Sequence, residues 1–203
     1  MFRALTRAAA AAFAVVAMLA VSAPALADST GEKPATADVG IASVGVATRV
    51  TIPKASLFQC PADFCNQGVA NPTDTVSLIC KIPGSTTPWG GTWSLVLNHA
   101  NYHVGFISDR FLEFPVTSQS CSNVGRGVHV TIPTASLFQC PADFCNQGVA
   151  NPADDVADIC YLSGSTTPWG GVWDLVLNHA NNHVGFISNS FLTSPQNPVT
   201  CQR

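Results

Sequence analysis

The 203-residue sequence contains few charged residues and no cluster of basic ones. Charged residues make up 10% of the chain, with nine Lys and Arg against twelve Asp and Glu. Nucleic acids and anionic membrane surfaces both require grouped Lys and Arg. We therefore expect neither nucleic acid nor a membrane surface as a partner.

Long apolar runs are also missing, with one exception near the N-terminus. Basic residues precede an apolar run at 8–21, and an Ala-Leu-Ala sequence ends at Ala27. This run is too short to span a bilayer comfortably, so residues 1–27 are predicted to be a cleaved signal peptide rather than an anchor. Its removal leaves a net charge of 7 − 12 = −5. The protein is expected to be secreted, either extracellular or associated with the cell wall.

Residues 28–43 are small and polar with little periodicity, which is typical of a flexible leader. Beyond them the chain consists of a tandem repeat of one sequence unit. With an offset of eighty residues, 44–121 aligns with 124–201, and 54 of the 78 aligned positions are identical. We call these segments copy 1 and copy 2; residues 122–123 link them.

Cysteine is abundant, and all eight cysteines follow the leader. Each copy has four in register: Cys60, Cys65, Cys80 and Cys121 in copy 1, and Cys140, Cys145, Cys160 and Cys201 in copy 2. An even number in an exported chain indicates disulfides rather than a metal site. Each copy is expected to close its own bonds and to fold as one domain, because a core of this size is marginal without crosslinks.

Within a copy the pattern predicts short strands and no helix. In copy 1, "RVTIP" (49–53) favours a strand, and 65–80 favours a hairpin that turns at 71–74. Apolar residues alternate in 93–98, and 104–108 follows as a partner strand. The fold class is therefore predicted to be all-β.

The expected hairpin at 65–80 also predicts the disulfide pairing. A turn centred between residues 72 and 73 places residues 65 and 80 opposite each other, within disulfide range. The prediction is Cys65–Cys80 with Cys60–Cys121 in copy 1, and Cys145–Cys160 with Cys140–Cys201 in copy 2.

The order of these segments resembles the bacterial SH3-like domain. Its pattern is a strand, a Gly-centred hairpin, a second strand, a Trp and Val, a tight turn, a Gly-aromatic-Ile sequence and a final aromatic-Leu. The matching residues are Gly68, Val76, Trp93, Val96, Gly105, Phe106, Ile107, Phe111 and Leu112, and in copy 2 Gly148, Val156, Trp173, Val176, Gly185, Phe186, Ile187, Phe191 and Leu192. The resemblance implies two small disulfide-bonded SH3-like β-barrels in tandem. It also implies a role in cell-wall targeting, since the family is often attached to cell-wall hydrolases.

Four aromatic residues are candidate ligand-binding residues. "TTPWGG" places Trp89 and Trp169 in Gly-flanked loops, where an aromatic ring suits stacking on a sugar or peptide. The alternative is that each Trp folds back over the core, as is expected of Trp93 and Trp173. Phe64 and Phe144 belong to the segment that flanks the ligand groove in SH3-like domains.

The histidine pairs, His99/His103 and His179/His183, are expected to flank a tight turn. Opposed residues on paired strands are close enough to share a metal, but a zinc site needs three or four ligands. Solvated turn histidines are therefore the preferred interpretation, and neither metal nor cofactor is expected.

Catalytic patterns are not found. The cysteines are expected to be oxidised, and no Ser lies in a Gly-x-Ser-x-Gly sequence. Asp154, Asp155 and Asp158 are interpreted as a solvated acidic turn. The chain is therefore predicted not to be an enzyme.

The prediction is a secreted binding protein that recognises peptidoglycan peptide or glycan through two modules. The alternative is a secreted inhibitor or adaptor that binds a partner protein such as a protease or toxin. The copies differ in charge, which is 4 − 4 = 0 over 44–121 and 1 − 5 = −4 over 124–201. Whether they share a ligand is left open by the sequence, as is the oligomeric state.

Overall fold

The computed structural model describes residues 44–63, 66–115, 117, 119–144, 146–193 and 199–201. Copy 1 contains β1 (Val46–Thr48), β2 (Ala55–Phe58), β3 (Asn66–Ala70), β4 (Val76–Thr87), β5 (Gly90–Asn98), β6 (His103–Ser108) and the short 3₁₀ helices η1 (Asp109–Phe111) and η2 (Cys121–Asn123). Copy 2 contains β7 (Arg126–Val128), β8 (Ala135–Phe138), β9 (Asn146–Ala150), β10 (Val156–Thr167), β11 (Gly170–Asn178), β12 (His183–Ser188) and η3 (Asn189–Phe191). The predicted signal peptide and the predicted leader lie outside the described residues.

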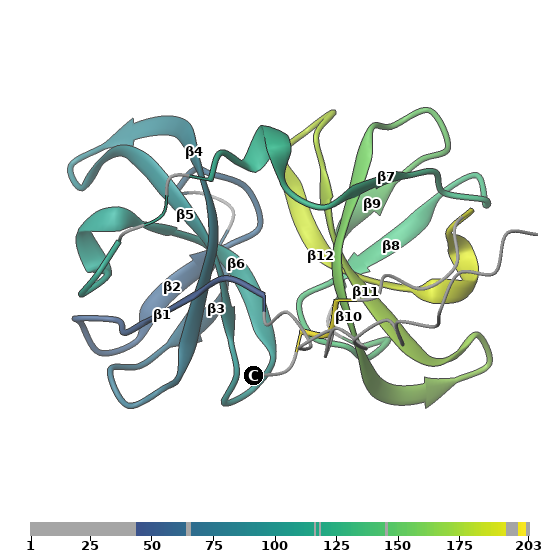
Figure 1. The fold of residues 1–203 in the computed structure, drawn as a ribbon, viewed down its shortest axis with the longest axis horizontal. Helices are drawn as coiled ribbons and strands as arrows, with labels where there is room; N and C mark the ends of the chain where they lie inside the picture. Colours follow the sequence, from purple (N-terminus) through teal and green to yellow (C-terminus); the bar gives the residue numbers. More distant parts are fainter. Residues whose placement is uncertain are drawn as a thin grey trace, which may run out of the picture. The chain divides into compact units, whose positions relative to one another are not determined.

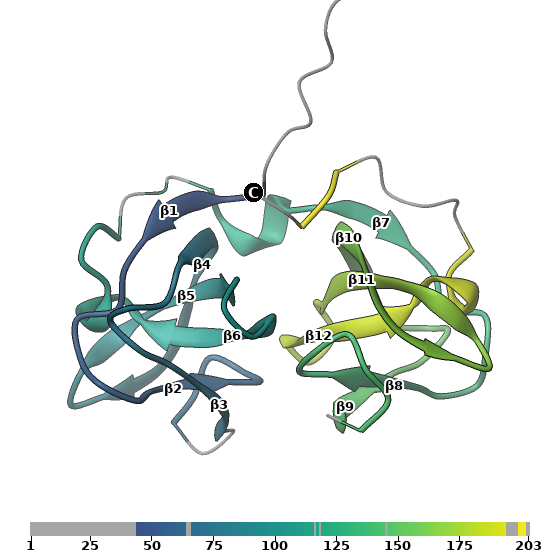
Figure 2. The same cartoon turned by 90° about the horizontal axis from the view of Figure 1, so that it is seen from below.

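Each copy forms one curled, six-stranded antiparallel sheet, so the all-β prediction is confirmed. The strand order is β1-β4-β5-β6-β2-β3 in copy 1 and β7-β10-β11-β12-β8-β9 in copy 2 (Figure 1). The long strand β4 shifts register against β5 between Leu78 and Cys80, and such a bulge bends a strand. The strands β1 and β3 lie at opposite ends of the sheet (Figure 2). The result is a half-barrel.

The hairpin predicted at 65–80 is wrong. The strand β3 pairs with β2, with Ala70 opposite Ala55, and not with β4. The chain does turn where expected, since Asp74 N–H donates to Asn71 O at 2.9 Å. Both edges of β4 are already occupied by β1 and β5. The turn therefore carries the chain from one end of the sheet to strands at the other.

The predicted disulfide pairing is wrong as a consequence. The bonds are Cys80–Cys121 and Cys160–Cys201, in place of Cys65–Cys80 with Cys60–Cys121, and of Cys145–Cys160 with Cys140–Cys201. Cys60 and Cys140 are disulfide-bonded as well. Cys65 and Cys145 lie outside the described residues.

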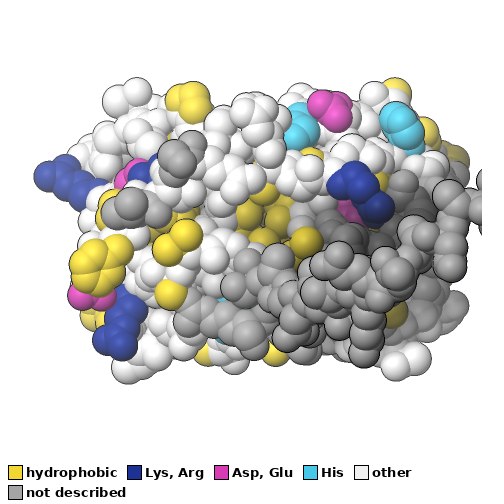
Figure 3. Space-filling view, viewed as in Figure 1, with side chains coloured by type: hydrophobic (Ala, Val, Ile, Leu, Met, Phe, Trp, Pro, Cys, Tyr) yellow, Lys and Arg dark blue, Asp and Glu magenta, His cyan; other side chains and the backbone are white. Residues whose placement is uncertain are grey.

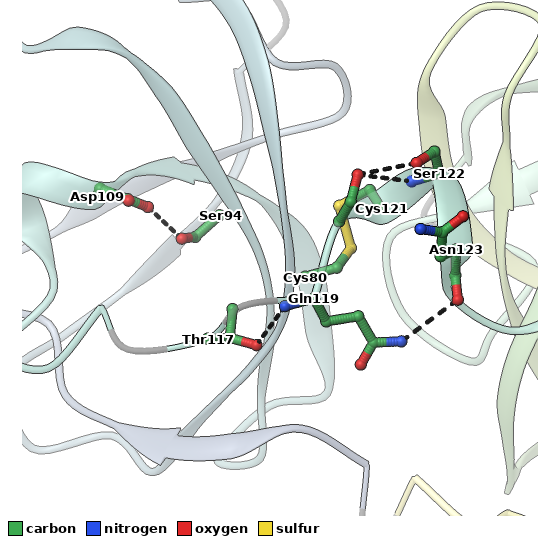
Figure 4. The surroundings of a disulfide bond; sticks show 9 residues. Cys80, Ser94, Asp109, Thr117, Gln119, Cys121, Ser122 and Asn123 are labelled. Atoms are coloured by element: carbon green, nitrogen blue, oxygen red, sulfur yellow. Dashed lines mark hydrogen bonds between the residues drawn. A yellow bond between two sulfur atoms is a disulfide. The ribbon is translucent and has the colours of Figure 1, made fainter.

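The segment before η2 explains the observed bond. It runs beside β4, where Lys81 N–H donates to Gln119 O at 3.0 Å and Lys81 bridges to Ser120 in parallel. This places Cys121, at the start of η2, next to Cys80 on β4 (Figure 4). The Cα atoms of the two cysteines are 4.9 Å apart.

The central strands are buried on both faces, and the two faces contribute to different cores. On β5, Val96 packs into a cluster made only of copy 1 residues. Leu95 and Leu97, which point the other way, belong to a cluster that contains buried residues of both copies. Copy 2 has its own private cluster around Val176. The predicted alternation in 93–98 is confirmed, and folding of either copy alone stays a prediction.

The disulfide Cys80–Cys121 should stabilise copy 1 substantially. It closes a loop with a sequence separation of 41, for which loop-closure entropy predicts about 4 kcal/mol. Replacing both cysteines by Ala should lower the free energy of unfolding by about 2–5 kcal/mol in thermal or urea unfolding. The matched pair Cys160→Ala with Cys201→Ala should cost about as much. Non-reducing peptide mapping that recovers Cys65 joined to Cys80 would contradict the observed pairing.

Candidate functional site

Trp89 lies at the tip of the β4–β5 hairpin, where Thr87 pairs with Gly90. Gly90 has a φ of 105°, in the region that favours glycine. Thr87 Oγ1 accepts a hydrogen bond from Trp89 N–H at 3.2 Å and donates to Gly90 O at 3.1 Å. Ser108 Oγ on β6 donates to Trp89 O at 3.0 Å. The backbone of the tip is therefore held from two strands, and the same bonds recur around Trp169.

The two loop tryptophans are partly exposed and rest on a second aromatic ring. Trp89 is 38% exposed and Trp169 is 43% exposed. The Trp89 ring lies 5.7 Å from the Phe111 ring at 55°, and Trp169 lies 5.5 Å from Phe191 at 54°. The phenylalanine fixes one side of each indole, and part of the indole stays open to solvent. An exposed indole of this kind can stack on a flat apolar surface such as a sugar ring.

The other two tryptophans are core residues, as predicted. Trp93 and Trp173 are 1% and 0% exposed. Each indole N–H donates to a backbone carbonyl of the same copy, at 3.1 Å to Ser85 O and at 3.0 Å to Ser165 O. The buried indole N–H groups therefore have hydrogen-bond partners, and these rings are not part of a surface site.

In copy 2 the exposed indole forms one wall of a groove. The groove has a volume of about 280 Å³, and it is lined by Ile132, Thr134, Ser136, Phe138, Trp169 and Phe191. Phe138 in turn packs edge-on against the buried Trp173, with ring centroids 5.5 Å apart. The groove floor is therefore anchored in the core, and its lining carries no charge.

In copy 1 the equivalent residues are Ile52, Lys54, Ser56, Phe58, Trp89 and Phe111. The aromatic arrangement is the same, because Phe58 packs edge-on against Trp93 at 5.5 Å, as Phe138 does against Trp173. We call the cavity of copy 2 the copy 2 groove, and, by the equivalence of its residues, we call the matching set in copy 1 the copy 1 groove.

Phe64 lies outside the described residues, and Phe144 does not join the groove. Phe144 is 80% exposed, and it is not one of the residues that line the copy 2 groove. The structure thus brings Trp169 together with Phe138 and Phe191, which the sequence analysis had assigned no binding role. Their aromatic character and the repeat were the only signals available in the sequence.

The histidine segment is a turn, as predicted, but its histidines are neither opposed nor fully solvated. Asn98 on β5 pairs with His103 on β6, so His99 lies in the loop. His99 Nε2 is 2.8 Å from Ser77 Oγ, a hydrogen bond from β4. His103 is partly buried, and this burial lowers its pKa. Among the described residues, no group of three or more His, Cys, Asp and Glu is placed to hold a metal ion.

His103 and His183 lie where the two copies meet. A Cβ added to Gly68 would lie 3.1 Å from His103 Nδ1 and 1.7 Å from Nε2 of Gln139, which belongs to copy 2. Gln139 O also accepts a hydrogen bond from Val104 N–H at 3.1 Å. The end of the Gln139 side chain thus occupies the space that a side chain at position 68 would fill.

The reciprocal contact has the same form. Val184 N–H donates to Gln59 O at 3.1 Å, and a Cβ on Gly148 would lie 1.9 Å from Gln59 Nε2. These contacts were missed by the sequence analysis. Two identical "FQCP" segments carry no sign that each reaches into the other copy.

Polar networks at equivalent positions differ between the copies. In copy 1, Asp109 accepts a hydrogen bond from Ser94 (Figure 4) and forms an ion pair with Lys81 at 2.6 Å. In copy 1 this carboxylate is in η1, whereas in copy 2 it is on β11, where Asp174 Oδ2 accepts from Asn189 Nδ2 at 2.7 Å. Tyr161 replaces the lysine, so the cation is lost.

Asp174 is consequently a buried carboxyl group with a strongly raised pKa. It is 0% exposed, and its Oδ1 has no hydrogen-bond partner among the described residues. Burial raises its pKa to about 7; the nearby Asp158 adds to the rise, and the Asn189 hydrogen bond and Arg126 oppose it. Asp174 is therefore a protonated acid under mildly acidic conditions.

The expectation of a solvated acidic turn is wrong for Asp158. This residue is 1% exposed and forms an ion pair with Arg126 at 3.3 Å across the β7–β10 pair. Asp154 belongs to the turn, but it accepts hydrogen bonds from Asn151 N–H at 2.9 Å and Asn178 Nδ2 at 2.7 Å. The Asn151 N–H first, and then Asn178, lower the pKa of Asp154. The carboxylates of Asp154 and Asp158 therefore stabilise the fold through hydrogen bonds and an ion pair.

Stability should fall with rising pH because of Asp174. Below about pH 4 its carboxyl is neutral in both states; between about pH 4 and about 7 the unfolded chain ionises while the folded one keeps its proton. The free energy of unfolding should therefore decrease across this window and level off above it. Asp174→Ser, which restores the residue of copy 1, should remove much of this slope and raise stability at pH 8 by on the order of 2 kcal/mol.

Thermal unfolding between pH 4 and 8 measures this effect. The exposed Asp155 in the neighbouring turn provides the control, since Asp155→Ser should leave the slope unchanged. A pH profile that is the same with Asp174 and with Ser at this position would contradict a raised pKa.

None of the short helices in the described part of the chain has the length and apolar character to span a bilayer. Comparisons with protein-family profiles, with curated protein sequences and with solved structures found no match.

Proposed function

We propose that this chain is a secreted, non-catalytic binding protein whose two aromatic grooves hold a cell-wall polymer, either the peptide or the glycan of peptidoglycan. The observation that carries the proposal is the exposed indole on a fixed phenylalanine, found at the same position in both copies. Sites for small ligands combine such apolar, aromatic surfaces with a few polar groups. Here Thr134 and Ser136 of the copy 2 groove are such polar groups.

The duplication supports a ligand that repeats. Two linked grooves make the second contact intramolecular, and this can raise the apparent affinity about 10²–10⁴-fold without any new contact. A wall polymer offers many equivalent units, whereas a monomeric partner protein offers one. Disulfides and the lack of a membrane-spanning helix in the described part of the chain are compatible with secretion.

Co-sedimentation with purified insoluble peptidoglycan tests the proposal. Trp89→Ala or Trp169→Ala should each weaken binding at least tenfold, because one groove is lost and with it the avidity. The double variant should not bind measurably. Val69→Ala with Val149→Ala is the control, since these side chains are exposed by 39% and 41% and neither lines the copy 2 groove nor lies at an equivalent position in copy 1.

Two outcomes would overturn the proposal. If the double Trp variant sediments like the unmodified chain while Phe144→Ala does not, the ligand binds at the exposed Phe144 instead. If the unmodified chain ignores peptidoglycan but retains a secreted protease or toxin in equimolar amount, the chain is an inhibitor or adaptor.

A further inference from the structure

The two grooves share their aromatic residues but differ in the residues at their rims. Copy 1 has Lys54 and Arg110 where copy 2 has Thr134 and Ser190. All four positions are exposed. These differences lie beside a surface that is otherwise nearly identical, so they bear on what each groove selects rather than on whether it forms.

Arg110 lies beside the Trp89–Phe111 pair, and Lys54 stands at the position equivalent to a residue of the copy 2 groove. Arg110 belongs to η1 next to Phe111, and its Nη1 donates to Pro88 O at 3.3 Å, directly before Trp89 in the hairpin tip. Lys54 precedes β2 at the position equivalent to Thr134, which lines the copy 2 groove. Lys54 therefore belongs to the set of residues that defines the copy 1 groove, and Arg110 adjoins that set through Phe111 and Pro88.

Neither cation is neutralised within the described part of the chain. The two ion pairs found there are Lys81–Asp109 and Arg126–Asp158. Of the four acidic side chains of copy 1, Asp109 is paired with Lys81, and Asp74 and Glu113 line a separate hollow with Arg49. The fourth, Asp63, is exposed and forms no ion pair with either cation in the described part of the chain. On the face shown in Figure 3, charged side chains are sparse and uncharged surface predominates. Two unpaired cations beside one aromatic surface are thus a distinctive feature of this chain.

We propose that the copy 1 groove selects a carboxylate-bearing segment of the polymer, whereas the copy 2 groove takes an uncharged segment. This proposal rests on the proposed function, because it names the ligand chemistry of the same grooves. A guanidinium presents a planar fork that matches a carboxylate, and an ammonium adds a second charge. The uncharged lining of the copy 2 groove offers no such attraction, and the net charge of −4 in copy 2 opposes an anion.

The backbone at Lys54 decides which substitution to use. Lys54 has a φ of 52°, and in the described part of the chain Thr134 is not among the non-glycine residues with positive φ. A β-branched Thr at position 54 would therefore strain the backbone. Lys54→Gln with Arg110→Gln removes both charges and keeps unbranched side chains.

The test uses the full chain and three preparations of insoluble peptidoglycan. One is unmodified, one has its carboxylates converted to amides by carbodiimide and ammonia, and one has been treated with cold hydrofluoric acid to remove phosphodiester polymers. The Lys54→Gln/Arg110→Gln variant should bind the unmodified wall about tenfold more weakly than the parent chain. On amidated wall the two proteins should bind alike, and on acid-treated wall the tenfold difference should remain.

A control and a gain-of-charge variant complete the design. Arg49→Gln removes a cation that lines the separate hollow, and it should leave binding unchanged. Thr134→Lys with Ser190→Arg should give copy 2 a new preference for carboxylates, seen as stronger binding to unmodified than to amidated wall. Added salt should weaken the charge-dependent part of binding.

The outcomes separate this inference from the proposed function. If the double Trp variant loses binding while the double Gln variant does not, the grooves bind the polymer but carboxylate selection is wrong. If the tenfold difference disappears on acid-treated wall, the anion is a phosphodiester and the carboxylate assignment is overturned. If the double Trp variant binds normally, both proposals fail together.

Discussion

Burial of both faces of the central strands is the constraint on which the rest of the structure depends. One face of β5 packs into the private core of copy 1, and the opposite face packs into a cluster that draws on both copies. The strand β11 has the same two-sided environment in copy 2. The disulfides Cys80–Cys121 and Cys160–Cys201 are members of the shared cluster. Crosslinks and shared apolar burial therefore act at the same place in the molecule.

The sequence predicted those parts of the fold that depend on neighbours along the chain. The β5–β6 hairpin, the buried Trp93 and the all-β class follow from apolar alternation and a local turn. The partner of β3 could not be predicted in this way, because the turn at 71–74 is compatible with a hairpin and also with a crossing to another strand. The disulfide pairing depended on that choice, so one wrong strand partner produced all the wrong pairs. Likewise, the sequence indicated that Trp89 lies in a loop. Its contact with the Phe111 ring, and the groove around the equivalent Trp169, could be seen only in the folded sheet.

The differences between the copies are coordinated where strands face each other. Val46 opposite Leu78 in copy 1 becomes Arg126 opposite Asp158 in copy 2, an apolar pair replaced by an ion pair. Such a pair of changes keeps the cross-strand contact favourable. Asp174 is different, because no lysine neutralises its carboxyl group. Tyr161 stands where copy 1 has Lys81, which forms the ion pair with Asp109. The copies have thus diverged in charge while keeping the same strand pairing and core, and the exposed groove rims differ in charge as well.

The reciprocal contacts of Gln59 and Gln139 make the junction between the copies isologous, since each copy supplies the same donor and the same acceptor. Contacts of this type usually join separate subunits, and their occupancy then depends on protein concentration. Here both partners lie on one polypeptide, joined by residues 122–123. The junction therefore forms by an intramolecular step, and dilution of the protein does not separate its halves.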